Sequence, residues 1–145
     1  MAYDVKNIAN KLLVMSELKG ELMSNMKLQK MLYYQQGYHL AYFGTPLFDD
    51  EIEAWMYGPV VPCVYEMFSS KKMEGIIGEE DKDFAFSDKK EECLFNEVFR
   101  VYGKYSAIGL MEMTHSETPW KTTPVGRGHV IGKEKIKAFF KKRLK

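Results

Sequence analysis

His115, Glu117 and Trp120 are the densest group of side chains that could do chemistry or bind a partner. An imidazole close to a carboxylate is the residue pair that a general acid–base hydrolase uses. The same residues suit two other roles: a preformed binding surface, or a structural one in which His115 caps a helix and Trp120 fills the core. A tryptophan is usually well buried, which favours the structural role.

Other chemistries lack the spacing that they need. A metal site would require the histidines and cysteines to converge, and none shows the close ligand spacing of a zinc site. Cys63 and His115 as a nucleophile pair have no support in the sequence, because a buried, inert cysteine is the commoner case. Gly126-Arg-Gly-His129 lacks the strand before it and the helix after it that a phosphate loop requires. We therefore expect no metal, no cofactor and no enzyme activity.

Composition limits the class of protein. A chain of 145 residues, 46% of them hydrophobic, suits one core, so a single domain over residues 1–145 is expected. The 21 basic and 20 acidic residues give a net charge of +1, which provides no strong attraction to nucleic acid or to an anionic membrane. No leader pattern and no run of about 18 apolar residues is present, and the two cysteines lie in apolar contexts. These features predict a reduced, cytoplasmic protein.

A long helix is predicted from Lys27 to Phe43, because the segment has no proline and its apolar residues recur at helical spacing. Its apolar face holds Leu28, Met31, Leu32, Tyr38, Tyr42 and Phe43. Its opposite face, which we expect to be solvated, holds Gln29, Lys30, Tyr33, Gln36 and Gly37. Gln35 and His39 fall near the middle of the apolar face, so both should be buried and hydrogen-bonded.

A half-buried strand is predicted from Glu51 to Tyr57, with Ile52, Ala54 and Met56 on the inner face. Trp55 and Tyr57 alternate with them, on a face that is either covered by a helix or open to a partner. Gly58, Pro59 and Pro62 then predict a sharp, rigid turn, in which Gly58 holds a conformation closed to a β-branched residue. Pro62 suits the first turn of a helix to about Phe68.

The remaining segments predict further helices and one more strand. Helices are expected at 5–18 after a cap at Asp4, at 88–102 after Ser87, at 107–114 after Ser106, and at 133–144. The strand is Asp83–Phe86, and residues 71–83 and 122–132 are expected to be loops. The predicted fold is mainly α with a small β element (α+β): one compact helical domain of about five to six helices plus a short two- or three-stranded sheet.

Five motifs, in this order, give the chain a family resemblance. They are Lys27-Leu-Gln-Lys-Met-Leu-Tyr-Tyr34, Gln36-Gly-Tyr-His-Leu-Ala41, Pro46-Leu-Phe48, Ile52-Glu-Ala-Trp-Met-Tyr-Gly-Pro-Val-Val-Pro62 and Thr114-His-Ser-Glu-Thr-Pro-Trp120. This combination resembles the Panacea domain, the phage-associated, SocA-like family found in many bacterial toxin–antitoxin operons. The resemblance implies an antitoxin of a type II-like system that binds and neutralises a co-encoded toxin protein. Gln35 departs from the small residue expected before Gln36-Gly37.

Candidate partner-binding residues follow from the resemblance and from the surplus of aromatic side chains. They are Lys27, Lys30, Trp55, Tyr57, His115, Glu117 and Trp120, with the condition for Trp55, Tyr57 and the two lysines that they are exposed. Two alternatives remain open: an adaptor that delivers a partner protein to a protease, and a small hydrolase that uses His115 and Glu117. Association of the chain with itself is compatible with either protein-binding role.

Overall fold

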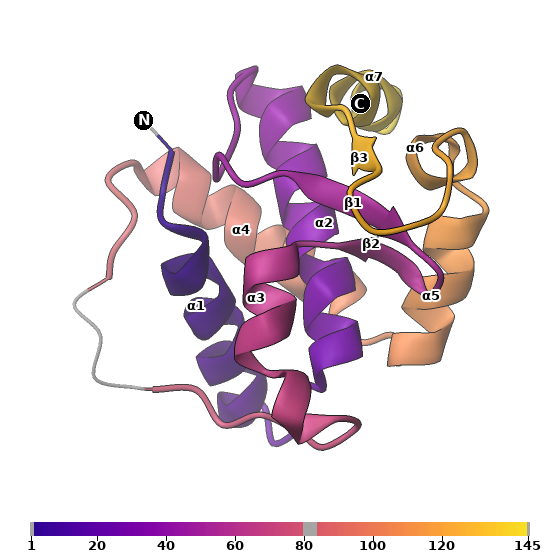
Figure 1. Ribbon diagram of the computed structural model, residues 1–145. Helices are drawn as coiled ribbons and strands as arrows, with labels where there is room; N and C mark the ends of the chain where they lie inside the picture. Colours follow the sequence, from indigo (N-terminus) through magenta and orange to yellow (C-terminus); the bar gives the residue numbers. More distant parts are fainter. Residues whose placement is uncertain (1, 80–83, 145) are drawn as a thin grey trace.

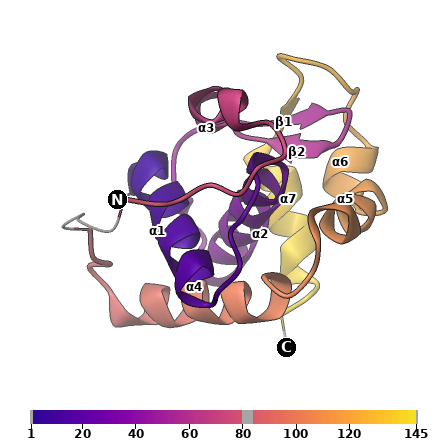
Figure 2. The ribbon, with the colours of Figure 1, turned by 90° about the horizontal axis from the view of Figure 1, so that it is seen from below.

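Helix α2 (Asn25–Phe43) runs through the centre of the molecule, and the other helices are arranged around it (Figures 1 and 2). The computed structural model describes residues 2–79 and 84–144. Within that part, α2 packs against α1 (Val5–Leu18), α3 (Pro62–Met67), α4 (Lys89–Tyr102), α5 (Ala107–His115) and α7 (Lys133–Lys141). Two short helical segments complete the set: η1 (Ser69–Lys71) and α6 (Thr118–Lys121). The mainly helical α+β architecture is therefore confirmed.

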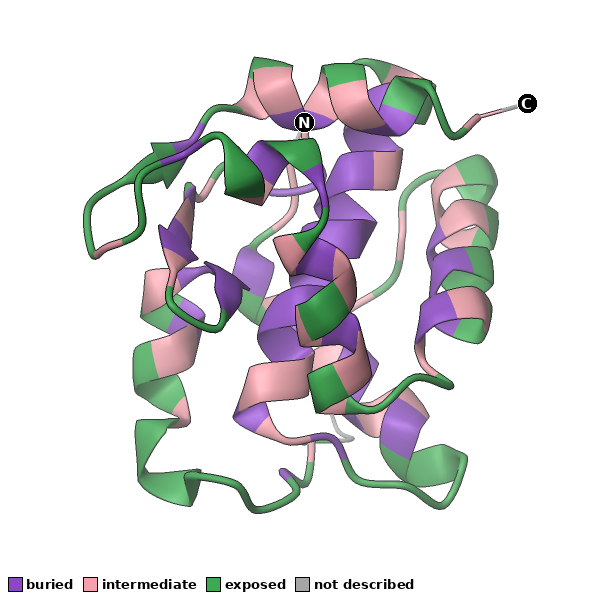
Figure 3. Ribbon diagram, turned by 90° about the vertical axis from the view of Figure 1, so that its right-hand side faces the viewer, coloured by how far each residue is buried: buried purple, intermediate pink, exposed green. Residues whose placement is uncertain are grey.

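The expected solvated face of α2 does not exist. Gln29, Lys30, Tyr33, Gln36 and Gly37 are all buried, and Figure 3 shows α2 as an almost continuously buried rod. The prediction was wrong because helical periodicity assumes that one side of a helix faces water, whereas α2 has neighbours on all sides. At Gly37, α7 approaches so closely that a Cβ atom would lie 2.3 Å from the Phe140 ring.

Most helix ends follow the predicted capping residues. Asp4 accepts from the Lys6 amide at 2.9 Å to start α1, and Ser106 accepts from the Gly109 amide at 3.0 Å to start α5. Pro62 lies in the first turn of α3, as predicted. The cap of α4 is Asp88 and not Ser87, whose hydroxyl instead contacts the Tyr3 hydroxyl at 2.9 Å.

The sheet has three antiparallel strands in the order β2-β1-β3: β1 (Ile52–Trp55), β2 (Gly58–Val60) and β3 (Val130–Ile131). A short sheet was expected, but β2 occupies the segment predicted as a turn. The chain reverses one step earlier, at Met56-Tyr57, and Gly58 begins β2 with φ +118° opposite Trp55. Met56 is therefore exposed at the tip of the hairpin and not on the inner face. Pro59 is tolerated because β2 is an edge strand.

The segment 122–132, predicted as a loop, holds β3 and is fixed to the sheet. The Gly126 amide donates to the Ala54 carbonyl at 2.8 Å, and the Ala54 amide donates to the His129 carbonyl at 2.9 Å. The predicted strand Asp83–Phe86 is not formed over Phe84–Phe86, and Asp83 lies outside the described residues. The rings of Phe84 and Phe86 pack instead on Tyr3.

The predicted buried polar pair of α2 is confirmed. Gln35 donates through Nε2 to the Phe95 carbonyl at 3.0 Å. His39 contacts the Thr45 carbonyl through Nδ1 at 2.6 Å and the Glu91 carboxylate through Nε2 at 2.7 Å. Both side chains are buried, and together they tie α2 to α4 and to the chain that follows α2.

The two cysteines are exposed, which corrects the expectation that they are buried. Cys63 lies on the outer side of α3, where its thiol donates to Asp50 at 3.4 Å, and Cys93 lies on the outer side of α4. None of the helices in the described part of the chain combines the length and the apolarity needed to cross a membrane.

Candidate functional site

A cavity of about 590 Å³ opens between the first half of α2, the β1–β2 hairpin and the α3–η1 segment. We call it the hairpin cavity. Its lining residues are Asn25, Met26, Gln29, Lys30, Trp55, Met56, Tyr57, Val60, Tyr65, Ser69, Lys72, Met73 and Arg127. The cavity thus collects apolar, aromatic and cationic side chains from four separate stretches of the chain.

Trp55 is the centre of the aromatic wall. Its ring meets Tyr65 edge-on at 5.1 Å between centroids, and the Arg127 guanidinium lies over it at 4.3 Å. The indole Nε1 donates to Glu53 at 2.8 Å, and the same carboxylate oxygen accepts from the Gly128 amide at 2.8 Å. This arrangement fixes the Arg127 loop beside the tryptophan.

The mouth of the cavity carries large exposed apolar side chains. Met56, Tyr57 and Met73 have 66%, 56% and 72% of their surfaces accessible. Methionine and tyrosine adapt well to a protein partner, since one is flexible and polarizable and the other combines an apolar body with a hydroxyl. Such a cluster at the rim of a cavity is typical of a protein-interaction site.

Lys30 lies beneath the hairpin with only 1% of its surface accessible, which corrects the expectation of a solvated lysine. In residues 2–79 and 84–144 its ammonium has neither a hydrogen bond nor an ion pair. Burial lowers the pKa of Lys30 to about 7, because the charged form loses its hydration. The Lys30 side chain fits beneath the hairpin because Gly58 has no side chain. A Cβ atom at Gly58 would lie 2.6 Å from Lys30 Cε.

The polar neighbours of Lys30 on α2 are already engaged. Gln29 accepts from the Val61 amide at 2.9 Å and donates to Asn25 Oδ1 at 2.9 Å. Asn25 in turn donates to the Tyr65 carbonyl at 3.1 Å. These bonds attach α2 to Val61, which follows β2, and to α3, whereas the Lys30 ammonium makes no hydrogen bond within the described part of the chain.

His115 and Trp120 support the hairpin from behind. Their rings stack at 4.1 Å with an interplanar angle of 24°. Trp120 Nε1 donates to the Trp55 carbonyl at 2.8 Å, and His115 Nε2 donates to the Met56 carbonyl at 3.0 Å. The Thr114–Trp120 motif and the hairpin motif, which are far apart in the sequence, therefore meet here, and the first positions the second.

Glu117 lies in the core and not in the cavity. Its carboxylate accepts from Tyr33 at 3.0 Å and from Tyr34 at 2.8 Å, and it pairs with Arg143 at 3.1 Å. Burial raises the pKa of Glu117, while the bonds from Tyr34 and Arg143 oppose the rise. Glu117 and His115 thus direct their polar atoms to different partners, which removes the geometric basis for a hydrolase pair.

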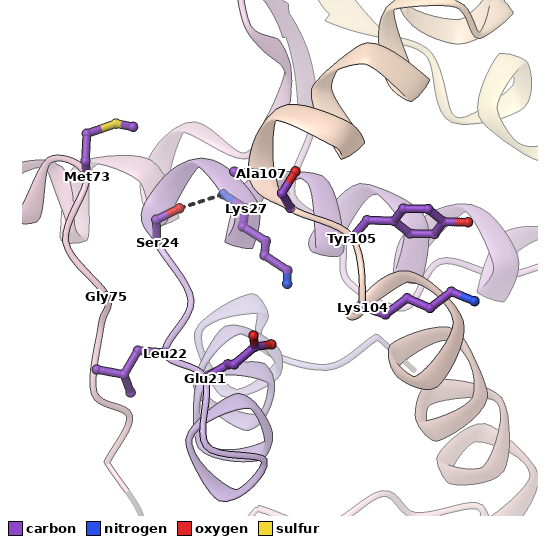
Figure 4. Close-up of a pocket in the computed structure, with 10 residues that line it drawn as sticks. Glu21, Leu22, Ser24, Lys27, Met73, Gly75, Lys104, Tyr105 and Ala107 are labelled. Carbon is purple, nitrogen blue, oxygen red and sulfur yellow. Dashed lines mark hydrogen bonds between the residues drawn. The ribbon is translucent and has the colours of Figure 1, made fainter.

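Lys27, one turn before Lys30, belongs to a second cavity of about 430 Å³ (Figure 4). Figure 4 shows its side chain extending toward Glu21, with Lys104 and Tyr105 on the other side. The Lys27 ammonium donates to the Gly103 carbonyl at 2.6 Å. The two cavities share Met73, so they form neighbouring parts of one face.

Sequence reasoning missed Arg127, Tyr65 and Met73. Arg127 lies in the Gly-Arg-Gly segment that was predicted to be a plain loop, and no spacing in the sequence relates it to Trp55. In the described part of the chain, no group of three or more His, Cys, Asp or Glu side chains is placed to hold a metal ion.

Comparisons with known proteins agree with the motifs of the two segments that meet at the hairpin. The family model described as "Antitoxin SocA-like, Panacea domain" matches residues 28–121, which include most of α2, the hairpin and the Thr114–Trp120 segment. Antitoxin SocA of Caulobacter vibrioides (strain NA1000 / CB15N) is 32% identical over 140 residues, covering 89% of this chain and 74% of that protein. No solved structure gives a significant match. The chain belongs to the SocA-like antitoxin family and carries its Panacea domain.

Proposed function

We propose that this protein neutralises a co-encoded toxin by direct, stoichiometric binding, and that the hairpin cavity is the centre of the contact. The observation that carries the proposal is the cluster of exposed aromatic and methionine side chains around a cavity, in a member of an antitoxin family. The unpaired cysteines suit action in the cytoplasm, where thiols stay reduced.

The candidate residues divide into anchors and supports. Trp55 and Tyr57 line the cavity from the hairpin and offer the aromatic surface that usually dominates protein–protein binding. His115 and Trp120 act through the hairpin, because their polar atoms hold its backbone. Glu117 acts within the core, since its carboxylate is enclosed by its partners. Direct contact with the toxin is thus assigned to fewer residues than were predicted from the sequence.

The test uses the product of the gene adjacent to this one as the toxin. Tyr57→Ala should weaken binding by about 2 kcal/mol, or about 30-fold, because a central tyrosine is a typical hot-spot residue. The melting temperature should stay unchanged, since the Tyr57 side chain is 56% exposed at the hairpin tip. Calorimetric titration gives the affinity, and growth rescue of toxin-expressing cells gives the activity.

Tyr42→Ala is the matched control, because Tyr42 is an equally exposed tyrosine at the far end of α2. It should leave both affinity and rescue unchanged. Equal weakening by the two variants would place the contact elsewhere. Rescue at antitoxin levels far below those of the toxin would contradict stoichiometric binding and would favour either delivery of the toxin to a protease or catalysis.

A further inference from the structure

We propose that the hairpin cavity is a receptor for a carboxylate carried on an apolar segment of the partner protein, and that the Lys30 ammonium is the group that pairs with it. The inference rests on the proposed function, and it specifies the chemistry of the toxin segment that enters the cavity. It concerns a residue that the sequence placed on an ordinary solvated surface.

Lys30 is buried, and its ammonium has no partner among the described residues. A buried ammonium without a partner is costly, because it gives up hydration and receives no compensating bond. In the described residues, every fully enclosed side-chain nitrogen or oxygen has a hydrogen-bond partner. Since Lys30 has none, its ammonium must keep a small contact with solvent, and the cavity is the space that Lys30 lines. A carboxylate in the cavity would supply the missing partner.

The charged side chains that line the hairpin cavity are all positive. Three lining residues are cations, Lys30, Lys72 and Arg127, and none of the described lining residues is an aspartate or glutamate. The nearby acids are already engaged: Glu53 accepts from Trp55 and Gly128, and Glu66 pairs with Arg127 at 3.3 Å. The cavity therefore attracts a negative group and cannot neutralise Lys30 from its own residues.

The rest of the lining favours a carboxylate on a protein segment over a free anion. Much of the remaining lining is apolar or aromatic: Met26, Trp55, Met56, Tyr57, Val60 and Met73. A phosphate needs several convergent donors, whereas a single buried ammonium matches one carboxylate whose neighbours bury against apolar walls. The occupant is thus an aspartate, a glutamate or a terminal carboxylate flanked by apolar residues of the toxin.

Lys30→Met is the informative variant, because methionine keeps the length and apolar bulk of lysine and removes the charge. We expect its affinity for the adjacent-gene product to fall by at least about 30-fold, the usual size of a hot-spot loss. Its melting temperature should equal or exceed that of the unaltered chain, since an unpaired buried charge has been removed. A purely structural lysine would give the opposite pattern, with lower stability and unchanged affinity of the folded fraction.

Lys90→Met is the control: it makes the same change at an exposed lysine of α4, a helix that contributes no residue to the lining of the hairpin cavity. It should change the affinity by no more than about threefold, as expected of a residue outside the hot spot. Equal losses for the two variants would show a general electrostatic attraction and would overturn the specific pairing.

A second arm keeps this chain unaltered and replaces each acidic residue of the toxin by its amide. One such replacement should weaken binding to the unaltered chain and have no further effect on Lys30→Met, which is the signature of a direct pair in a double-mutant cycle. If the unaltered chain does not bind the toxin, the proposed function itself fails. If it binds, and neither Lys30→Met nor any amide replacement weakens it, only the carboxylate receptor fails.

Discussion

Glu117 and Lys30 are both charged and almost fully buried, with 3% and 1% of their surfaces accessible, but their surroundings differ. The Glu117 carboxylate is enclosed by two tyrosine hydroxyls and the Arg143 guanidinium. The Lys30 ammonium has no such partner in the described part of the chain and lies against an open cavity. Glu117 therefore has its hydrogen-bonding partners within the protein, whereas the Lys30 ammonium has none among the described residues.

The difference separates a structural role from a binding role. A buried charge with all its hydrogen bonds made joins the elements that supply the partners, here α2, the turn after α7 and the start of α6. A buried charge without partners lowers stability, and the loss is recovered when a binding partner supplies the missing bonds or when the group gives up its charge. The contrast also explains why some residues of the family motifs lie in the core while others line the hairpin cavity.

Glu117→Ala should have the largest effect on stability. It leaves Arg143 and the two tyrosine hydroxyls without their acceptor, and removing one partner from a buried charged network costs about 3 kcal/mol. Urea unfolding followed by circular dichroism measures the loss. Glu112→Ala, at an exposed position of α5, is the control and should stay within about 0.5 kcal/mol. A loss below about 1 kcal/mol for Glu117→Ala would mean that the Glu117 network does not stabilise the contact between α2 and the turn after α7.

Gly58→Val should destabilise by about 2 kcal/mol, because the residue has φ +118° and its Cβ would press on Lys30. Gly44→Val separates the two causes, since Gly44 also has a positive φ of +80° but no atom within 4 Å of its Cβ position. We expect a smaller loss of about 1 kcal/mol there. Equal losses in urea unfolding would show that the hairpin does not confine the Lys30 side chain.

Lys30 should also impose a pH dependence on stability. Its pKa falls from 10.5 in the unfolded chain to about 7 in the folded protein, through burial. Below pH 7 both states hold the proton and the cost of the buried charge is fully present. Above pH 7 the folded state releases its proton first, so stability rises with pH until the unfolded state also titrates near 10.5.

The measurement is the difference in unfolding free energy between the unaltered chain and Lys30→Met at pH 7, 8 and 9. Groups common to both proteins cancel, and the unaltered chain should gain about 2 kcal/mol relative to the variant over that range. If the unfolding free energies of the two proteins changed in parallel with pH, the Lys30 ammonium would be solvated. Lys30 and Glu117 would then not differ in the way described above.

The helix starts, two buried polar residues of α2 and the family could be predicted from the sequence. Asp4 and Ser106 start helices because their side chains accept backbone amides within the same turn, and that interaction needs no other part of the chain. The helical phase of α2 also placed Gln35 and His39 in the interior, where both are hydrogen-bonded. The ordered motifs indicated the family, and the match over residues 28–121 confirms it.

The burial of each side of α2, and the surroundings of its charged side chains, depend on the tertiary packing. Periodicity distinguishes a more apolar face from a less apolar one, but it does not show that neighbours cover both, as they do here. The burial of Lys30 depends on a hairpin that brings Gly58 over it from far along the chain. The partners of Glu117 come from two segments that are far from it in the chain, so no spacing in the sequence could reveal that its carboxylate is enclosed while the Lys30 ammonium is left to face a cavity.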